Sequence, residues 1–232
     1  NAAIVGLGWW GQVLVNSVQG KSDKIRFTKG TTRTLSKAED FANEKGVELV
    51  ASYEDLLADP DVDAVVLATP HSMHRPQTEA AAAAGKHVFC EKPFTLYKAD
   101  AVAASAAAEA AGIILAIGQN RRVNPAFIDL QKRVADNWFG TLLHVEGHMS
   151  APGLWKYTPG SWRVDRDECP AGGMTGMGIH LLDAIVAMFG EVESVYAQSR
   201  RIIQSEGLDE MTSAMLKLKS GVSAYLATSV AT

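Results

Sequence analysis

The most constraining feature of the sequence is a set of three glycines with G-x-G-x-x-G spacing near its start. Gly6-Leu-Gly-Trp-Trp-Gly11 directly follows the apolar segment 2–5 and opens a helical stretch that runs to residue 18. In this context the first glycine permits a tight turn, the second lets backbone approach a pyrophosphate, and the third allows close helix–strand packing. We therefore predict a dinucleotide-binding turn; a merely structural turn is the alternative. The expected contacts are Gly6, Gly8, Trp9, Trp10 and Gly11. For the two tryptophans, burial in the core or at an interface is an equally good interpretation.

The first half of the chain alternates short apolar runs with helical stretches. Strands are expected at 2–5, 25–29, 64–69, 87–90 and 113–117, and helices at 11–18, 36–45, 53–58, 77–84 and in the alanine-rich segment from residue 101. Ser36 is expected to cap its helix, with Glu39 in the capping-box position. The alternation predicts a doubly wound parallel sheet covered by helices on both faces.

The pattern changes near Gly118. A helix at 125–137 precedes alternating segments at 142–149, 194–199, 211–217 and 222–229, which are typical of antiparallel strands, and a helix at 178–189 interrupts them. We expect residues 1–118 to form a Rossmann domain. Residues 119–232 are expected to form an α+β domain that binds the substrate and forms the oligomer interface. This domain would be built on a large open, mostly antiparallel sheet and be incomplete at its C-terminal end.

Composition narrows the class of partner. A net charge of −4 and an isoelectric point near 5.9 argue against a nucleic-acid surface and favour a small-molecule ligand. Two distant cysteines, Cys90 and Cys169, indicate a reducing, cytoplasmic compartment. Because the sequence begins without methionine, an export signal upstream of it is left as an alternative. We expect no membrane span, and no metal site because neither the pair His71 and His74 nor the pair His144 and His148 has a completing ligand.

The end of the second strand bears on cofactor choice. The segment Lys29-Gly-Thr-Thr-Arg-Thr34 has no acidic residue before Glu39 to bind a ribose 2′-hydroxyl. Thr32 and Arg33 instead offer groups that accommodate a 2′-phosphate, so NADP(H) is favoured over NAD(H). An exposed basic loop is the alternative.

Five further motifs resemble those of one known family. They are Thr69-Pro-His-Ser-Met-His74, Gly85-Lys-His-Val-Phe-Cys-Glu-Lys-Pro93, Gly118-Gln-Asn-Arg-Arg-Val-Asn-Pro125, Ser161-Trp-Arg163 and Gly172-Gly-Met-Thr-Gly-Met-Gly-Ile-His-Leu-Leu-Asp183. With the N-terminal turn, they occur in the order found in the Gfo/Idh/MocA oxidoreductases, a family that includes glucose–fructose oxidoreductase, inositol dehydrogenases and dihydrodiol dehydrogenases.

The resemblance implies a homodimer or homotetramer assembled through the open sheet of the second domain. It also implies cofactor contacts from a set of residues in these motifs. They are Thr69, Pro70, His74, Glu91, Lys92, Arg122, Trp162 and Arg163.

Lys92 and His180 are the candidate catalytic residues. Lys92 follows a parallel strand at the edge where such sheets bind ligands, and partial burial could lower its pKa enough for acid–base work. A surface pair of Glu91 and Lys92 is the alternative. By resemblance, His180 is a proton acceptor that acts with an acidic residue four positions earlier, but this chain has Gly176 there. The substrate is expected to contact Lys92, His148, Met177 and His180.

These features predict an NADP-dependent oxidoreductase of the type acting on CH–OH groups. Hydride would pass between the nicotinamide and a carbinol or carbonyl carbon of a sugar-like or cyclic diol substrate. Lys92 would act as general acid/base and His180 would assist it. Because Gly176 replaces the family's acidic residue, the alternative is a non-catalytic NAD(P)-binding sensor or regulator on the same fold.

Overall fold

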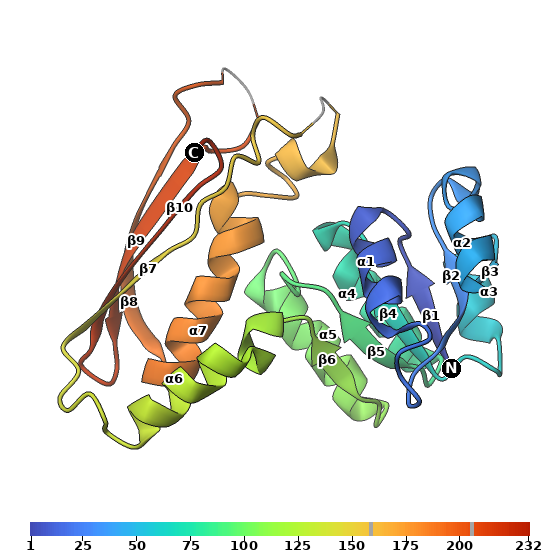
Figure 1. The fold of residues 1–232 in the computed structure, drawn as a ribbon, viewed down its shortest axis with the longest axis horizontal. Coiled ribbons are helices and arrows are strands. Elements are labelled where there is room, and N and C mark those ends of the chain that lie inside the picture. The colour runs from blue at the N-terminus through green and yellow to red at the C-terminus, as the bar shows by residue number, and fades with distance from the viewer. Residues whose placement is uncertain (158–159, 205–206) are drawn as a thin grey trace. The chain divides into compact units, whose positions relative to one another are not determined.

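The computed structural model describes residues 1–157, 160–204 and 207–232. The chain divides into two compact units, Asn1–Gly118 and Gln119–Thr232 (Figure 1). Each unit has its own sheet and its own hydrophobic core.

The first unit is built on a six-stranded parallel sheet in the order β3-β2-β1-β4-β5-β6. The strands are β1 (Ala2–Val5), β2 (Phe27–Thr31), β3 (Glu48–Leu49), β4 (Ala64–Leu67), β5 (His87–Cys90) and β6 (Leu115–Ile117). The helices are α1 (Trp9–Val18), α2 (Glu39–Lys45), α3 (Tyr53–Ala58), α4 (His74–Ala83) and α5 (Lys98–Ala110). This is the doubly wound Rossmann order that the sequence predicts.

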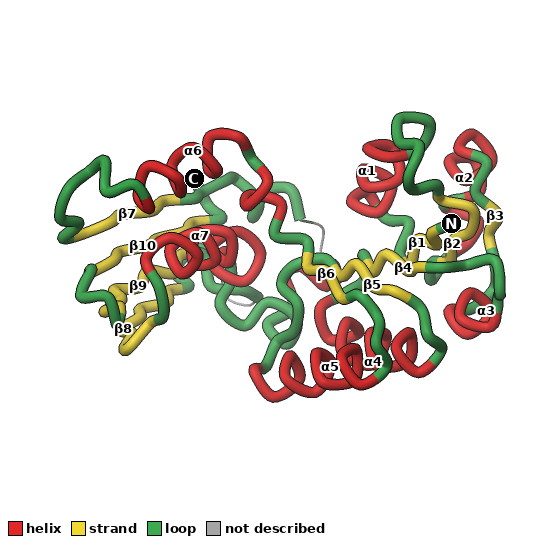
Figure 2. The backbone as a smooth tube through the Cα atoms, turned by 90° about the horizontal axis from the view of Figure 1, so that it is seen from below, coloured by secondary structure: helices red, strands yellow, loops and turns green. Residues whose placement is uncertain are grey.

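Side chains on the central strand alternate between two hydrophobic layers. Ile4 packs in a cluster with Val15 of α1 and Phe27, whereas Val5 packs in a cluster with Leu56 of α3 and Leu67. Figure 2 shows α1 and α2 on one face of the sheet and α3, α4 and α5 on the other. Each of these side chains, when fully buried, contributes about 1.5–3 kcal/mol to folding. The strand order reverses between β1 and β4, so the carboxyl ends of these two strands form the ligand-binding edge of such a sheet.

Several predicted bounds in this unit are wrong: the strand expected at 64–69 ends at Leu67, the strand expected at 113–117 begins at Leu115, and the helix expected at 77–84 begins at His74.

Two further differences have a local physical cause. The second strand begins at Phe27 rather than residue 25, because Ser22 Oγ accepts the backbone N–H groups of Lys24 and Ile25 and holds them in a turn. Ser36 caps no α-helix: it lies inside a 3₁₀ turn, and α2 starts after it at Glu39. A capping box does occur at α3, where Ser52 and Asp55 exchange hydrogen bonds.

The second unit combines a four-stranded sheet with helices α6 (Pro125–Ala135) and α7 (Ile179–Phe189). The sheet has the order β7-β10-β9-β8. Its strands are β7 (His144–His148), β8 (Val192–Arg200), β9 (Met211–Leu218) and β10 (Ser223–Ser229). The expected antiparallel pairing holds for β8, β9 and β10, but β7 runs parallel to β10. The sheet is therefore mixed and mostly antiparallel.

One face of this sheet is covered and the other is open. Leu216, Leu226 and Ile185 of α7 belong to one buried cluster on the covered face. On the open face, Tyr196, Met215 and Tyr225 lie side by side across three strands. Within the part of the chain that the structure describes, no helix packs on this face (Figure 1).

Leu226→Ala should destabilise the second unit by about 2–5 kcal/mol, because the Leu226 side chain is 1% exposed and its loss leaves a cavity. The matched control is Leu143→Ala, at a side chain 76% exposed, which should change stability by less than about 0.5 kcal/mol. Urea denaturation followed by circular dichroism measures both. Equal midpoints for the two variants would contradict this description of the core.

Candidate functional site

The glycine turn between β1 and α1 combines close packing with one open position. Gly6 has φ +94°, and a Cβ there would lie 2.6 Å from the carbonyl oxygen of Ala68, at the end of β4. A Cβ at Gly11 would overlap the carbonyl oxygen of Gly6. In contrast, a Cβ added at Gly8 would have no neighbouring atom within 4 Å. The turn therefore brings the ends of β1 and β4 together and leaves space over Gly8.

The N-terminus of α1 is suited to an anion. Gly8 is its N-cap residue, and among the described residues no side chain caps the helix or places an acid in its first turn. Such a helix start presents N–H donors and the positive end of the helix dipole. Together with the space over Gly8, this fits the pyrophosphate of a dinucleotide.

Trp9 and Trp10 differ in environment. Trp9 is 73% exposed, and its ring centroid lies 5.4 Å from that of Trp10. Trp10 is partly buried, and its Nε1–H has no hydrogen-bond partner among the described residues. Both residues lie in the first turn of α1, next to the predicted phosphate position.

The end of β2 carries the predicted cofactor-selecting residues. Thr31 ends the strand and is buried, and Thr32 and Arg33 follow it, half-buried and exposed respectively. This position, at the carboxyl end of the strand next to β1, is where Rossmann domains contact the adenosine ribose.

His74 links the loops that follow β4 and β5. Its side chain is fully buried; Nδ1 lies 3.0 Å from the carbonyl oxygen of Pro93 and 3.2 Å from that of Phe94, and Nε2 lies 3.1 Å from that of Thr69. The Thr69 hydroxyl in turn donates to Gln77 Oε1 at 2.6 Å. His74 therefore helps to hold the loop that contains Lys92 in place. Its predicted contact with the cofactor stays a prediction.

Lys92 lies two residues after the end of β5. It is half-buried, its backbone N–H donates to the Glu91 carboxylate at 3.2 Å, and a cis peptide bond joins it to Pro93. The Glu91 side chain is buried against Gly118, where a Cβ would lie 2.8 Å from Glu91 Oε1. Glu91 is thus held in the unit's interior rather than in an exposed pair with Lys92.

In the second unit, the glycine-rich segment before α7 packs closely on its surroundings. A Cβ at Gly172, where φ is +53°, would overlap the backbone of Asp209, and one at Gly173 would lie 2.9 Å from Val230 Cγ1. A Cβ at Gly178 would overlap Met174 Sδ. Gly176 differs, because no atom lies within 4 Å of a Cβ there.

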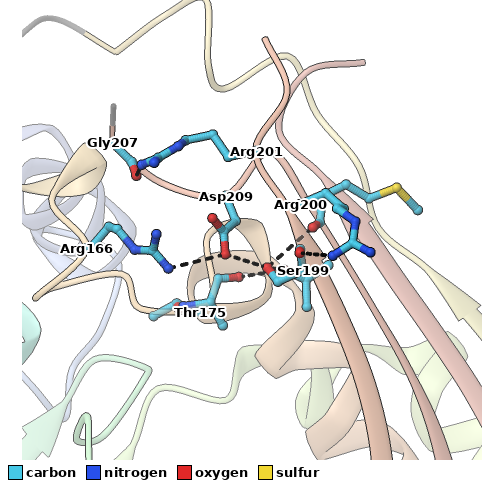
Figure 3. Close-up of polar contacts among 10 residues, drawn as sticks. Arg166, Thr175, Ser199, Arg200, Arg201, Gly207 and Asp209 are labelled. Carbon is cyan, nitrogen blue, oxygen red and sulfur yellow. Dashed lines mark hydrogen bonds and ion pairs between the residues drawn. The ribbon is translucent and has the colours of Figure 1, made fainter. Parts of the chain in front are cut away.

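A polar network holds this segment beside the loop before it (Figure 3). The Asp209 carboxylate accepts from the Ser199 hydroxyl at 2.7 Å and pairs with Arg166 at 3.5 Å. Ser199 Oγ also lies 2.8 Å from Thr212 Oγ1, whose hydroxyl donates to the Ala171 carbonyl at 3.1 Å. The network thereby joins strands β8 and β9 to Arg166 and Ala171, which precede the glycines.

Trp162 and Arg163 form a 3₁₀ turn close in sequence to Arg166. The Arg163 guanidinium lies 4.3 Å from the centroid of the Trp162 ring, and the Arg163 backbone N–H donates to Ser161 Oγ at 3.3 Å. The two predicted cofactor residues therefore contact each other as one cation–π pair.

His180, in the first turn of α7, is 9% exposed. Its Nδ1 lies 3.2 Å from Gln119 Oε1. One turn further along α7, Asp183 accepts two hydrogen bonds from Arg122, at 2.7 and 2.8 Å. This contact uses two of the five N–H donors of Arg122. The hydrogen bonds to Asp183 raise the pKa of the Arg122 guanidinium. The predicted cofactor role of Arg122 is not tested by this contact.

The two remaining predicted substrate residues lie in different places. Met177 is partly buried against a cluster that contains Leu154 and Leu208. His148 is exposed on β7, and its ring centroid lies 5.6 Å from that of Tyr225 on the open face of the sheet.

The structure adds residues that the sequence did not single out. Gln119, Asp183 and Asp209 make their contacts across 61, 61 and 10 residues respectively, so no local spacing reveals them. Among the described residues, no cluster of three histidine, cysteine or acidic side chains could hold a metal ion. Within the same residues, no helix is both long and apolar enough to cross a bilayer.

Comparison with known families identifies the chain. Residues 1–119 match the family described as "Oxidoreductase family, NAD-binding Rossmann fold", and residues 127–232 match the "GFO/IDH/MocA C-terminal domain". The chain therefore belongs to the Gfo/Idh/MocA oxidoreductases, as its motifs indicate.

Three relatives illustrate the similarity. The 1,5-anhydro-D-fructose reductase of Ensifer adhaerens is 31% identical over 185 residues, covering 78% of this chain and 55% of that protein. The scyllo-inositol 2-dehydrogenase (NADP(+)) IolW of Bacillus subtilis is 28% identical over 198 residues, covering 84% and 53%. GenD2 from gentamicin A biosynthesis, solved in complex with NAD, has a TM-score of 0.92 at 26% identity, covering 100% of this chain and 66% of that one. The chain spans about half the length of the curated relatives it matches.

The turn glycines provide a matched pair of substitutions. Gly11→Ala should destabilise the first unit by about 1–3 kcal/mol or more, because the new methyl group overlaps the Gly6 carbonyl. Gly8→Ala adds the same group to open space and should leave stability within about 0.5 kcal/mol of the native value. Urea unfolding curves compare the two, and a Gly8→Ala variant as unstable as Gly11→Ala would contradict the described turn.

Proposed function

We propose that the protein is an NADP-dependent oxidoreductase that acts on a carbinol or carbonyl carbon of a sugar-like or cyclic diol substrate. The observation that carries this proposal is the glycine turn, which leaves space over Gly8 and an uncapped helix start at the switch point of a Rossmann sheet. Membership of an NAD-binding oxidoreductase family supports it, as do relatives that act on an anhydrosugar and an inositol.

Residues of the first unit would hold the pyrophosphate and the adenosine end of the cofactor. Backbone N–H groups at the start of α1 bind the pyrophosphate, and the Thr32 hydroxyl and Arg33 guanidinium bind the 2′-phosphate. The relatives include one named for NADP(+) and one solved with NAD, so the preference for NADP rests on the residues after β2.

Lys92 and His180 would manage the proton that accompanies hydride transfer. When bound, the nicotinamide ring accepts or supplies the hydride. The Lys92 ammonium group donates a proton to the substrate oxygen during reduction, and the neutral amine accepts it during oxidation. His180 assists by accepting a hydrogen bond or a proton from the substrate hydroxyl.

Assembly and compartment complete the proposal. The exposed aromatic and methionine side chains in the middle of the open sheet face, Tyr196 and Met215, suit a homodimer or homotetramer formed through that face. A buried thiol at Cys90 is compatible with a reducing, cytoplasmic compartment.

Lys92→Ala should abolish turnover, because it removes the proton donor and acceptor. Binding of NADPH should remain within a few-fold of native, since the pyrophosphate and 2′-phosphate contacts are elsewhere. Cofactor consumption with a panel of polyols, ketoses and dihydrodiols measures turnover. Titration followed by tryptophan fluorescence measures NADPH binding. Lys98→Ala, an exposed lysine at the start of α5, is the control and should leave both unchanged. If native protein binds NADPH but consumes none with any substrate, the sensor alternative replaces the enzyme.

Arg33→Ala should weaken NADPH binding roughly 10- to 100-fold and leave NADH binding nearly unchanged, because a charge-assisted contact to the 2′-phosphate is lost. Fluorescence titration with both cofactors measures the ratio of the two dissociation constants. Lys37→Ala, an exposed cation of the same region, provides the control for a general change in charge. An unchanged ratio in Arg33→Ala would refute the assigned selectivity.

A further inference from the structure

The contact between Gln119 and His180 indicates which ring nitrogen of the histidine bears hydrogen. The carboxamide oxygen of Gln119 lies 3.2 Å from Nδ1 of His180. A carboxamide oxygen accepts hydrogen bonds and cannot donate them, so Nδ1 is the donor. In a neutral imidazole the other nitrogen, Nε2, then carries the lone pair. Nε2 is the atom with which His180 can accept a proton.

We infer that Gln119 is a positioning residue that takes over the orienting role of the family's missing carboxylate, by fixing His180 in the Nδ1–H tautomer. This inference rests on the proposed function, in which His180 assists proton transfer. Gln119 itself acts only through His180. In other enzymes a hydrogen bond to one imidazole nitrogen sets both the tautomer and the direction of the ring, which determines how well the opposite nitrogen works as a base.

The environment of Gly176 shows that packing does not account for the missing acidic residue. This residue stands one helical turn before His180, where the resemblance places an acidic residue. Gly172, Gly173 and Gly178 are packed so closely that a side chain would collide with neighbouring atoms, but a Cβ at Gly176 would have no neighbour within 4 Å. Packing therefore does not impose glycine at this position, and the family's orienting carboxylate is simply absent from it.

A second contact holds Gln119 in place. Gln119 precedes the 3₁₀ turn Asn120–Val123, which contains Arg122. Arg122 and Asp183 form a bidentate ion pair, and the Asp183 side chain is only 12% exposed. Gln119 and Arg122 are three residues apart, as are His180 and Asp183, so the segment is joined to α7 at two successive points. The ion pair therefore restrains the backbone segment that carries Gln119.

The acceptor is neutral, which separates its effect from that of a carboxylate. A carboxylate would orient the ring and also stabilise the imidazolium cation by its charge. Gln119 orients the ring without adding negative charge. Its contribution is therefore to the geometry of proton transfer, and removing it should lower kcat while leaving cofactor binding unchanged.

The tautomer can be measured directly, without turnover. The full chain is labelled with ¹⁵N-histidine, and long-range ¹H–¹⁵N spectra are recorded above the ordinary histidine pKa of about 6.5. The chain has six histidines, and His180→Gln assigns the signal. We expect the Nδ1–H form for native protein and for Gln119→Glu, which keeps an acceptor oxygen. Gln119→Leu should shift the signal towards a tautomer mixture, whereas Asn120→Leu, at an exposed neighbouring amide, should not. A native His180 in the Nε2–H form would overturn the inference.

Kinetics then connect the tautomer to the reaction. Gln119→Leu should lower kcat roughly 10- to 100-fold, part of the 10²–10⁴ that a positioned acid or base supplies, with Gln119→Glu restoring most of it. The dissociation constant for NADPH should stay within a few-fold of native. A Gln119→Leu variant with altered tautomer and native kcat would refute the link to catalysis. If no variant, nor native protein, turns over while native His180 shows the Nδ1–H form, the proposed function fails and the tautomer assignment stands.

Discussion

Direct contact between main-chain segments is the constraint on which both units depend. At the end of β1, Gly6 lies against the backbone of Ala68 and Gly11 lies against Gly6, so that strand, helix and neighbouring strand converge without side chains between them. In the second unit, Gly172 lies in the same way against Asp209. A methyl group at any of these positions would force backbone apart, and close-packed interiors do not absorb such a displacement cheaply. The candidate site in each unit is built beside such a contact.

The glycines that do not pack closely have a different meaning. Gly8 and Gly176 both face open space, yet each lies within a few residues of a glycine that packing requires. Open space at Gly8 lies at the positive end of a helix dipole, and such a position attracts an anion. Open space at Gly176 lies one turn before a buried histidine. Because all these glycines look alike in the sequence, only their surroundings distinguish a packing role from a binding role.

Much of the fold was predictable because it depends on local patterns. The apolar strands 64–69 and 87–90, the helix at residue 53 and the change of pattern near Gly118 all reflect periodicity that the sequence displays. The errors occurred where a side-chain hydrogen bond competes with that periodicity, as at Ser22 before β2, or where pairing direction depends on tertiary structure, as for β7 and β10. Motifs singled out Lys92 and His180 as candidates, and their catalytic roles stay a prediction. Gln119 and Asp183 were not identified as site residues, because their partners lie 61 residues away and only the folded chain brings them together.

The second unit separates charge from orientation at His180. Arg122 and Asp183, one turn along the same helix, form a self-neutralising pair, since the guanidinium and carboxylate bond to each other in a bidentate contact. Gln119, which bonds Nδ1 of the ring, has no charge. The contact with Gln119 therefore directs the ring without itself supplying a negative charge to the imidazolium form. In the proposed function, Lys92 exchanges the proton as ammonium and amine while Gln119 orients His180, so neither role requires an acidic residue at position 176.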